Sequence, residues 1–265
     1  ERAGVALLHP LALRLPDLNE LLLAAASPDP EALYAKRESL RRVIAQRLRP
    51  QLKAIALQRS ETPFSPSAGA AARRSLKSAA IDLLAALGEE EADTLRTAFD
   101  DADNMTAAIA ALEGLSASGA AAFDAALEQF YARWRDNPLV IDKWFAVQAA
   151  TPRTDALKRA EALRTHPDFN IRNPNRVRAL AAAFGMRNMR ALHAADGSGY
   201  RFLAALARDV DALNPALAAR LLTAFESWRR FDSSRQAHAR AALQSLAALK
   251  DLSKNTSEVV ERTLG

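Results

Sequence analysis

The sequence predicts an all-α protein, built as an α-α superhelix or solenoid of antiparallel helix pairs. Alanine and leucine, which are strong helix formers, dominate the chain. Apolar residues recur at helical spacing, as at Leu203, Leu206, Val210 and Leu213, whereas alternating β-branched residues are scarce. Short loops between successive helices, without heptads, favour a solenoid over a four-helix bundle. No strict repeat period is visible, so no named repeat family is indicated.

Proline stands where helices can begin. The pairs Asn137-Pro138, Asn173-Pro174 and Asn214-Pro215 each precede an apolar run of helical period, and Ser27-Pro28 and Thr151-Pro152 do likewise. An Asn, Ser or Thr side chain caps free backbone N–H groups, and proline fits the first helical position because its missing N–H has no partner there. These pairs therefore predict helix starts rather than breaks.

The pattern predicts a helix in most of the chain, within one domain. The expected helices span residues 17–25, 29–58, 66–86, 89–101, 104–114, 119–135, 138–149, 153–164, 174–184, 198–212, 215–230, 234–247 and 254–263. We expect Gly88, Gly114 and Gly119 to mark helix ends or turns. The polar loop around Glu61 to Ser67 is too short for a domain linker, so we expect a single domain over residues 1–265.

Composition bounds the class of protein. The chain has 265 residues, 49% hydrophobic and 25% charged, the balance of a soluble globular protein. It contains no cysteine, which excludes disulfides, thiolate zinc sites and a cysteine nucleophile, and fits a reducing compartment such as the cytoplasm. The net charge of +5 is small and interleaved, so we expect no nucleic-acid partner.

Neither a membrane anchor nor a leader is expected from the sequence. No apolar run approaches the ~18 residues that a spanning helix needs, so we expect no membrane partner. No positively charged leader with an apolar core is visible. Because the chain opens on Glu1 rather than methionine, we expect it to be part of a longer protein.

No catalytic or metal-binding motif is visible. No two histidines lie four residues apart and no H-E-x-x-H occurs, so we expect turn and surface histidines and no metal or cofactor in this chain. Gly197-Ser198-Gly199 is not a G-x-S-x-G nucleophile motif and is read as a turn before a helix. The histidines are His9, His166, His193 and His238.

Acidic and aromatic clusters also have structural interpretations. The run Glu89-Glu90-Glu91 opens a predicted helix, where the dipole favours negative charge, and Asp100 to Asp103 lacks the spacing of a calcium loop. Both clusters are interpreted as solvated caps. Trp134, Trp144 and Phe145 are expected to pack the core of a helical hairpin.

Two arginines are the candidate binding residues. Arg178 lies in the segment "NPNRVRAL" (residues 173–180), beside the apolar positions Val177 and Leu180. Arg220 stands about 60° from the direction of Leu217 on its helix, at the edge of the buried face. Such an arginine usually extends into water, or on the concave face of a solenoid it meets a carbonyl or carboxylate.

Several blocks of sequence resemble the C-terminal helical domain of bacterial aminopeptidase N. The resemblance covers most of residues 17–265 and is weak over residues 1–16. The segment "GMRNMRAL", residues 185–192, departs from it by being bulkier and more basic. The matching blocks are "ADNMTAAIAAL" (102–112), "LVIDKWFAVQAATP" (139–152), "NPNRVRALAAAF" (173–184), "LHAADGSGY" (192–200) and the run from Leu213 to Leu243.

The resemblance implies the non-catalytic part of a zinc aminopeptidase that removes N-terminal residues from peptides. Enzymes of this family hold zinc through H-E-x-x-H and a downstream glutamate, and bind the substrate amino group through a G-A-M-E-N-like motif. This chain has neither, so we expect it to be inactive alone, with no catalytic residue, its partners being the catalytic domain of the same polypeptide and peptide substrates.

The resemblance also implies what the domain does. It walls an internal cavity, restricts access and contacts the peptide away from the scissile bond, with Arg220 and Arg178 lining the cavity. The alternative from the residues alone is a free-standing α-solenoid scaffold that binds protein or RNA.

Overall fold

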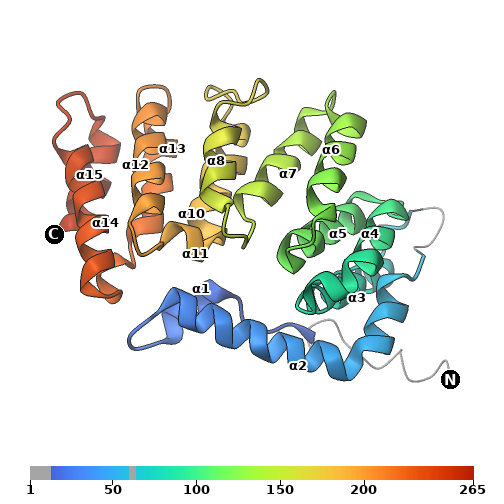
Figure 1. Ribbon diagram of the computed structural model, residues 1–265. Coiled ribbons are helices and arrows are strands. Elements are labelled where there is room, and N and C mark those ends of the chain that lie inside the picture. Colours follow the sequence, from blue (N-terminus) through green and yellow to red (C-terminus); the bar gives the residue numbers. More distant parts are fainter. Residues whose placement is uncertain (1–12, 60–63) are drawn as a thin grey trace. The chain divides into compact units, whose positions relative to one another are not determined.

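The computed structural model describes residues 13–59 and 64–265, and the described chain is helical without strands (Figure 1). His9 and part of the predicted loop after Glu61 lie outside these residues. The described residues form two compact units: unit 1 holds residues 13–16 and 35–140, and unit 2 holds residues 17–34 and 141–265. The all-α prediction is confirmed, while the single domain over residues 1–265 stays a prediction.

Unit 1 is built around α5, which packs against α3, α4 and α6. The predicted starts and lengths of these helices agree with the structure to within a few residues, except at the end of α5. The helices with residues in unit 1 are α2 (Pro30–Ala56), α3 (Ala68–Ala85), the 3₁₀ turn η3 (Gly88–Glu91), α4 (Ala92–Asp100), α5 (Met105–Ser118), α6 (Ala122–Trp134) and the first turn of α7 (Pro138–Ala149).

Gly114 does not end a helix, so that prediction is wrong. It lies inside α5, and a Cβ atom there would come 2.7 Å from Cγ2 of Ile81 on α3. The glycine thus permits the close approach of α3 and α5, and the helix continues to Gly119. Gly88 and Gly119 do mark turns, with φ of 73° and 74°.

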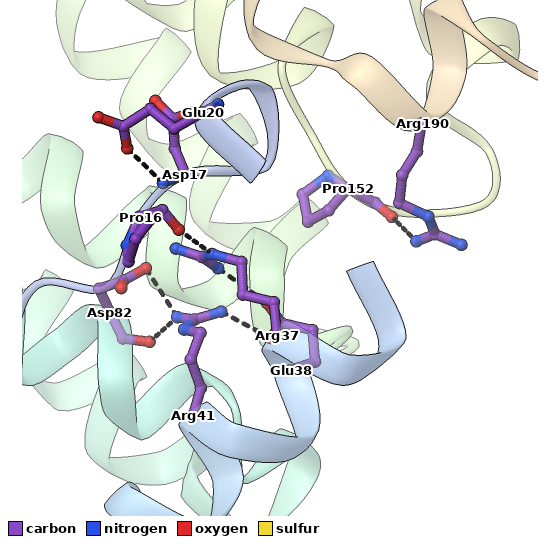
Figure 2. Close-up of polar contacts among 9 residues, drawn as sticks. All are labelled: Pro16, Asp17, Glu20, Arg37, Glu38, Arg41, Asp82, Pro152 and Arg190. Carbon is purple, nitrogen blue, oxygen red and sulfur yellow. Dashed lines mark hydrogen bonds and ion pairs between the residues drawn. The ribbon is translucent and has the colours of Figure 1, made fainter. Parts of the chain in front are cut away.

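Charged side chains join the inner side of α2 to α3 and η3. Arg41 pairs with the Asp82 carboxylate at 2.7 Å (Figure 2), and Arg49 Nε lies 2.5 Å from Oε1 of Glu91. Glu91 is fully buried, so its interpretation as a solvated cap is wrong. Burial opposes its ionisation, but hydrogen bonds from Thr94 and Arg49 outweigh that effect and lower the pKa of Glu91.

Unit 2 combines two parts of the chain that are distant in sequence, residues 17–34 and residues 141–265. Within it, α12 packs against α13 and α14, and α15 packs against α13 and α14 (Figure 1). Its elements are α1 (Leu18–Ala24), the start of α2, most of α7, α8 (Ala156–Arg164), α9 (Pro174–Val177), η4 (Arg178–Ala182), α10 (Ala183–Arg187), α11 (Met189–Leu192), α12 (Ser198–Asp211), α13 (Pro215–Leu222), η5 (Thr223–Phe225), η6 (Trp228–Arg230), α14 (Ser233–Ala247) and α15 (Lys254–Leu264).

Two predicted helices of unit 2 are less regular than expected. The helix over 174–184 contains the π-helical turn η4, and α11 follows it, where the sequence pattern predicts no helix. The helix over 215–230 ends at Leu222 and continues as separate 3₁₀ turns. The apolar spacing persists through these breaks, because Phe225 and Trp228 are both buried, so periodicity alone does not reveal them.

Two arginines fasten residues 17–34 to the rest of unit 2. Arg190 binds Glu31 at 2.8 Å. It also donates to the Pro152 carbonyl at 2.8 Å (Figure 2). Arg230 donates to the carbonyls of Leu23 and Ala25, at 2.9 and 2.7 Å. The α1 region is therefore held through its backbone as well as through a salt bridge.

Candidate functional site

The predicted cavity arginine Arg178 is exposed at the start of the π-helical turn η4. Its Nη1 donates to Oδ1 of Asn175 at 3.0 Å, one turn back on the same helical segment. The neighbouring side chains Val177 and Leu180 are fully buried and anchor the segment. Single π-helical turns are frequent at functional sites. Here the turn places the Arg178 guanidinium in solvent, where most of its N–H donors are available to a ligand.

The first arginine of "NPNRVR" has a different place. Arg176 is 5% exposed, its Nε donates to Asp142 Oδ1 at 2.6 Å, and its guanidinium lies 4.6 Å from the Phe145 ring centre. It also donates to the Asp168 carbonyl. Arg176 is therefore a structural residue that joins α7, the loop after α8 and α9, and only Arg178 remains available to a ligand.

Arg220 lies in the last turn of α13 and is exposed. Asn214 caps this helix by accepting from the N–H of Leu217 at 3.0 Å, and Leu217 and Leu221 anchor it in the core. Within residues 13–59 and 64–265, no hydrogen bond or ion pair is made by the Arg220 guanidinium. A cation in a last turn also interacts favourably with the helix dipole, which is its structural contribution.

Arg178 and Arg220 are both cations with donors only, so neither can hydrogen-bond to or ion-pair with the other. Both side chains belong to unit 2, and both stand in solvent beside a buried helix face, as the periodicity predicted. Their shared role in binding a peptide stays a prediction.

The segment "HAADGSGY", residues 193–200, contains a cluster of buried polar contacts around His193. His193 is 1% exposed, and its Nδ1 lies 2.7 Å from the Tyr200 hydroxyl oxygen. Its ring stacks on Phe231 with 4.0 Å between centres, and Arg235 donates to its backbone carbonyl at 2.7 Å. Burial, with the positive charge of Arg235, lowers the pKa of His193 from 6.5 to about 3, and burial raises the pKa of Tyr200.

The surface interpretation of the histidines is therefore wrong for His193. His166 is half-buried and lies edge-on to Phe145, with ring centres 5.7 Å apart, and His238 is half-buried too. The histidines of the described chain serve packing.

Among Trp134, Trp144 and Phe145, Phe145 is fully buried and Trp144 nearly so, with ring centres 5.2 Å apart, whereas Trp134 is half-buried.

The glycines of this segment are fixed by close packing. Gly197 has φ of 70°, and a Cβ atom there would overlap the His238 ring. A Cβ at Gly199 would overlap the Ala191 carbonyl oxygen and come 2.7 Å from Leu192 Cα. Ser198 donates to Asp196 Oδ1 at 2.7 Å, which lowers the pKa of Asp196. The turn interpretation is confirmed, and Ser198 serves that turn.

A cavity of about 10 Å³ lies beside His193 and is bounded in part by Phe231, Arg230 and Leu22. Such a volume holds about one water molecule and no peptide. The cavity is therefore a packing feature between α1 and the His193 region of unit 2.

The described residues offer no metal site of three or more His, Asp or Glu side chains. The described residues therefore do not fit the zinc that the resemblance implies. In residues 13–59 and 64–265, no helix is long and apolar enough to cross a membrane.

Comparison with known proteins identifies the family. Residues 5–265 match a family model described as a domain of unknown function (DUF3458_C) with ARM repeats. The chain belongs to the DUF3458_C family. ARM repeats stack helices into a superhelix, so the predicted solenoid class is confirmed.

Curated relatives of this DUF3458_C chain are aminopeptidases N. It is 41% identical over 259 residues to that of Caulobacter vibrioides, covering 96% of the chain and 30% of the relative. It is 36% identical over 253 residues to that of Escherichia coli, covering 95% and 29%. The chain thus spans less than a third of these relatives, and its resemblance to a region of bacterial aminopeptidase N is confirmed.

A solved structure supports the same relationship. The crystal structure of Legionella pneumophila aminopeptidase A in complex with aspartic acid aligns with a TM-score of 0.85 at 29% identity. The alignment covers 96% of this DUF3458_C chain and 31% of that one. The helical arrangement is therefore that of the matching domain in a larger aminopeptidase.

Proposed function

We propose that the chain is the C-terminal domain of a zinc-dependent aminopeptidase N, which removes N-terminal residues from peptides in the bacterial cytoplasm. The observation that carries the proposal is the 41% identity to the Caulobacter vibrioides enzyme along 96% of this chain. In this proposal the catalytic zinc belongs to another domain of the same polypeptide, because the family resemblance implies that its H-E-x-x-H ligands lie there. The domain alone is inactive.

The domain contributes shape and polar contacts. Its helical wall bounds the internal cavity and limits which peptides enter, while Arg178 and Arg220 contact the peptide away from the scissile bond. The exposure of the two arginines supports this role. Arg178 has one short-range partner, Asn175, and both guanidinium groups reach solvent. A planar guanidinium matches a peptide carbonyl or a C-terminal carboxylate. Contacts far from the reacting bond orient the substrate and thereby assist catalysis.

The experiment compares the chain alone with the full-length polypeptide that carries it. Both are purified, their zinc is measured, and their hydrolysis of an amino-acid amide and of a peptide is followed. The expected result is one zinc and activity on both substrates in the full-length polypeptide, and neither zinc nor activity in the chain alone. A full-length polypeptide without aminopeptidase activity overturns the proposal, and zinc-dependent activity in the chain alone overturns its non-catalytic role.

A further inference from the structure

The outer face of α2 carries a narrow apolar stripe that nothing in the described chain covers. Leu40, Val43 and Leu57 are 50%, 51% and 41% exposed, although large apolar side chains are normally found inside. Between them on the same face lie Arg47, Pro50 and Ala54, all exposed. We define the α2 stripe as residues 40, 43, 47, 50, 54 and 57, all of them in unit 1.

The spacing of the α2 stripe is that of a helix-packing seam. Its steps alternate between three and four residues from Leu40 to Leu57, which keeps the side chains on one face through about five helical turns, a length of roughly 27 Å. The opposite side of the helix is already occupied: Ala45, Leu52 and Ile55 are buried. The helix therefore has two faces built for packing, of which one is satisfied.

The charges around the stripe restrict what can cover it. Between residues 35 and 59, Lys36, Arg47 and Arg59 are exposed cations. Within the described residues, none of the three has a salt bridge or hydrogen bond. Glu38 is half-buried and binds Arg41 at 2.6 Å on the inner side. The surface that fits the stripe is apolar opposite Leu40, Val43 and Leu57 and carries carboxylates opposite Arg47.

A second copy of the chain and a lipid surface both fit less well. Two copies paired through the stripe bring their Arg47 side chains close together near its middle, where like charges repel. Helices that lie on membranes insert Trp, Phe and Leu, whereas this stripe has no aromatic residue and includes Ala54.

We infer that the α2 stripe is the docking surface for the part of the same polypeptide that lies outside this region. The inference rests on the proposed function. The greater part of each aminopeptidase N relative lies outside the match, since the match covers 30% and 29% of their lengths. A protein surface attached to the same chain meets the stripe at high effective concentration, so a modest apolar contact with carboxylates beside Arg47 suffices.

The test uses thiol reactivity, because the chain has no cysteine of its own. V43C places a thiol in the stripe, and A54C does so a few turns further along. K254C is the matched control, because the Lys254 side chain is 88% exposed in α15, far along the chain from α2. Each variant is made in the chain alone and in the full-length polypeptide, alkylated with a maleimide, and read by peptide mass spectrometry.

The expected result is protection of the stripe in the full-length polypeptide only. The V43C and A54C thiols should react roughly tenfold more slowly there than in the chain alone, while the K254C thiol changes less than about twofold, because alkylation requires access. Equal rates at V43C and A54C in both proteins overturn the inference.

The other occupants give different outcomes, each of which also overturns it. Protection of the chain alone that rises with protein concentration, with a dimer in sedimentation, indicates a second copy. Protection that appears only with vesicles containing phosphatidylglycerol indicates a membrane surface. Aminopeptidase activity of the unsubstituted full-length polypeptide is measured separately, so an active enzyme with an unprotected stripe refutes the docking surface and leaves the proposed function standing. An inactive polypeptide with a protected stripe refutes the proposed function and leaves the docking surface standing.

Discussion

The segments 173–180 and 193–200 are both polar, both precede or contain a helix start, and use their polar groups differently. In residues 193–200, the His193 ring, the Tyr200 hydroxyl and both glycines are committed to packing within unit 2. In residues 173–180, Arg176 is committed in the same way, whereas Arg178 extends into solvent. A marked helix start therefore does not by itself indicate a binding site.

The two segments differ in whether their polar side chains are buried and hydrogen-bonded within the fold. A buried group that has its hydrogen bonds stabilises the fold, and removing one partner leaves the other unsatisfied at a cost of about 1–3 kcal/mol. An exposed cation with one neighbour contributes little to stability and keeps its donors for a ligand.

The largest effect on stability is expected from Gly199→Ala. The new methyl group overlaps the Ala191 carbonyl oxygen, so α12 must move away from α11, at a cost of about 3 kcal/mol or more. Urea unfolding followed by circular dichroism measures the change. Gly69→Ala is the matched control, because its nearest neighbour is 3.7 Å away, and it should leave the chain as stable or slightly more so. Equal stability of the two variants would show that the tight turn can relax.

Arg176→Met comes next, with a loss of about 2 kcal/mol in the free energy of unfolding. The methionine keeps much of the packing against Phe145 but leaves the Asp142 carboxylate, 17% exposed, without its Arg176 partner. Arg178→Met in the same helical segment is the control and should cost less than about 0.5 kcal/mol. The comparison between the two arginines fails if both substitutions cost the same.

His193→Phe should change how stability depends on pH. The pKa of His193 is 6.5 in its ordinary state and about 3 in the fold, so between these values the unfolded chain binds the extra proton. The free energy of unfolding of the unsubstituted chain therefore falls as the pH drops from about 6.5 towards 3, by at most about 1.4 kcal/mol per pH unit from this group.

The phenylalanine variant loses the Tyr200 hydrogen bond at all pH values but should lack this part of the slope. Tyr200→Phe is the control that removes the bond and keeps the histidine. The carboxylates of Asp196 and Asp232, whose pKa values are lowered, add the same slope to all three proteins and cancel in the differences. Identical slopes for His193→Phe and the unsubstituted chain would contradict a buried neutral His193.

The smallest effect on stability is expected from Arg178→Ala and Arg220→Ala. Both side chains are exposed, so each substitution should change the free energy of unfolding by less than about 0.5 kcal/mol. Thermal unfolding of the single variants and of the double variant checks this. A large loss at either position would mean that the residue serves the fold, as Arg176 does.

Local signals in the sequence predicted most helix starts. Asn173, Asn214 and Pro138 stand where helices begin, because capping and the missing proline N–H act within one turn. The sequence did not reveal the role of Gly114, since the side chain that excludes a Cβ there, Ile81, belongs to another helix. The breaks after Leu222 were missed because buried apolar spacing continues through them.

Long-range partners account for the rest. Nothing near Arg190 or Glu91 in the sequence identifies their partners, Glu31 and Arg49, which lie far away along the chain. The exposure of Arg178 and Arg220 at the edge of a buried face followed from periodicity, because helical spacing sets the direction of a side chain. Whether they share a ligand depends on tertiary placement, which spacing does not give.

The proposed arginine contacts are tested by substrate length, in the full-length polypeptide that carries this chain. The values of kcat/KM for a tetrapeptide and for a small amino-acid amide are compared for the unsubstituted polypeptide, Arg220→Ala and Arg178→Ala. We predict a loss of roughly tenfold on the tetrapeptide at one or both positions and little change on the amide, because only the longer substrate reaches a guanidinium away from the scissile bond. Equal losses on both substrates, or none on either, would contradict it.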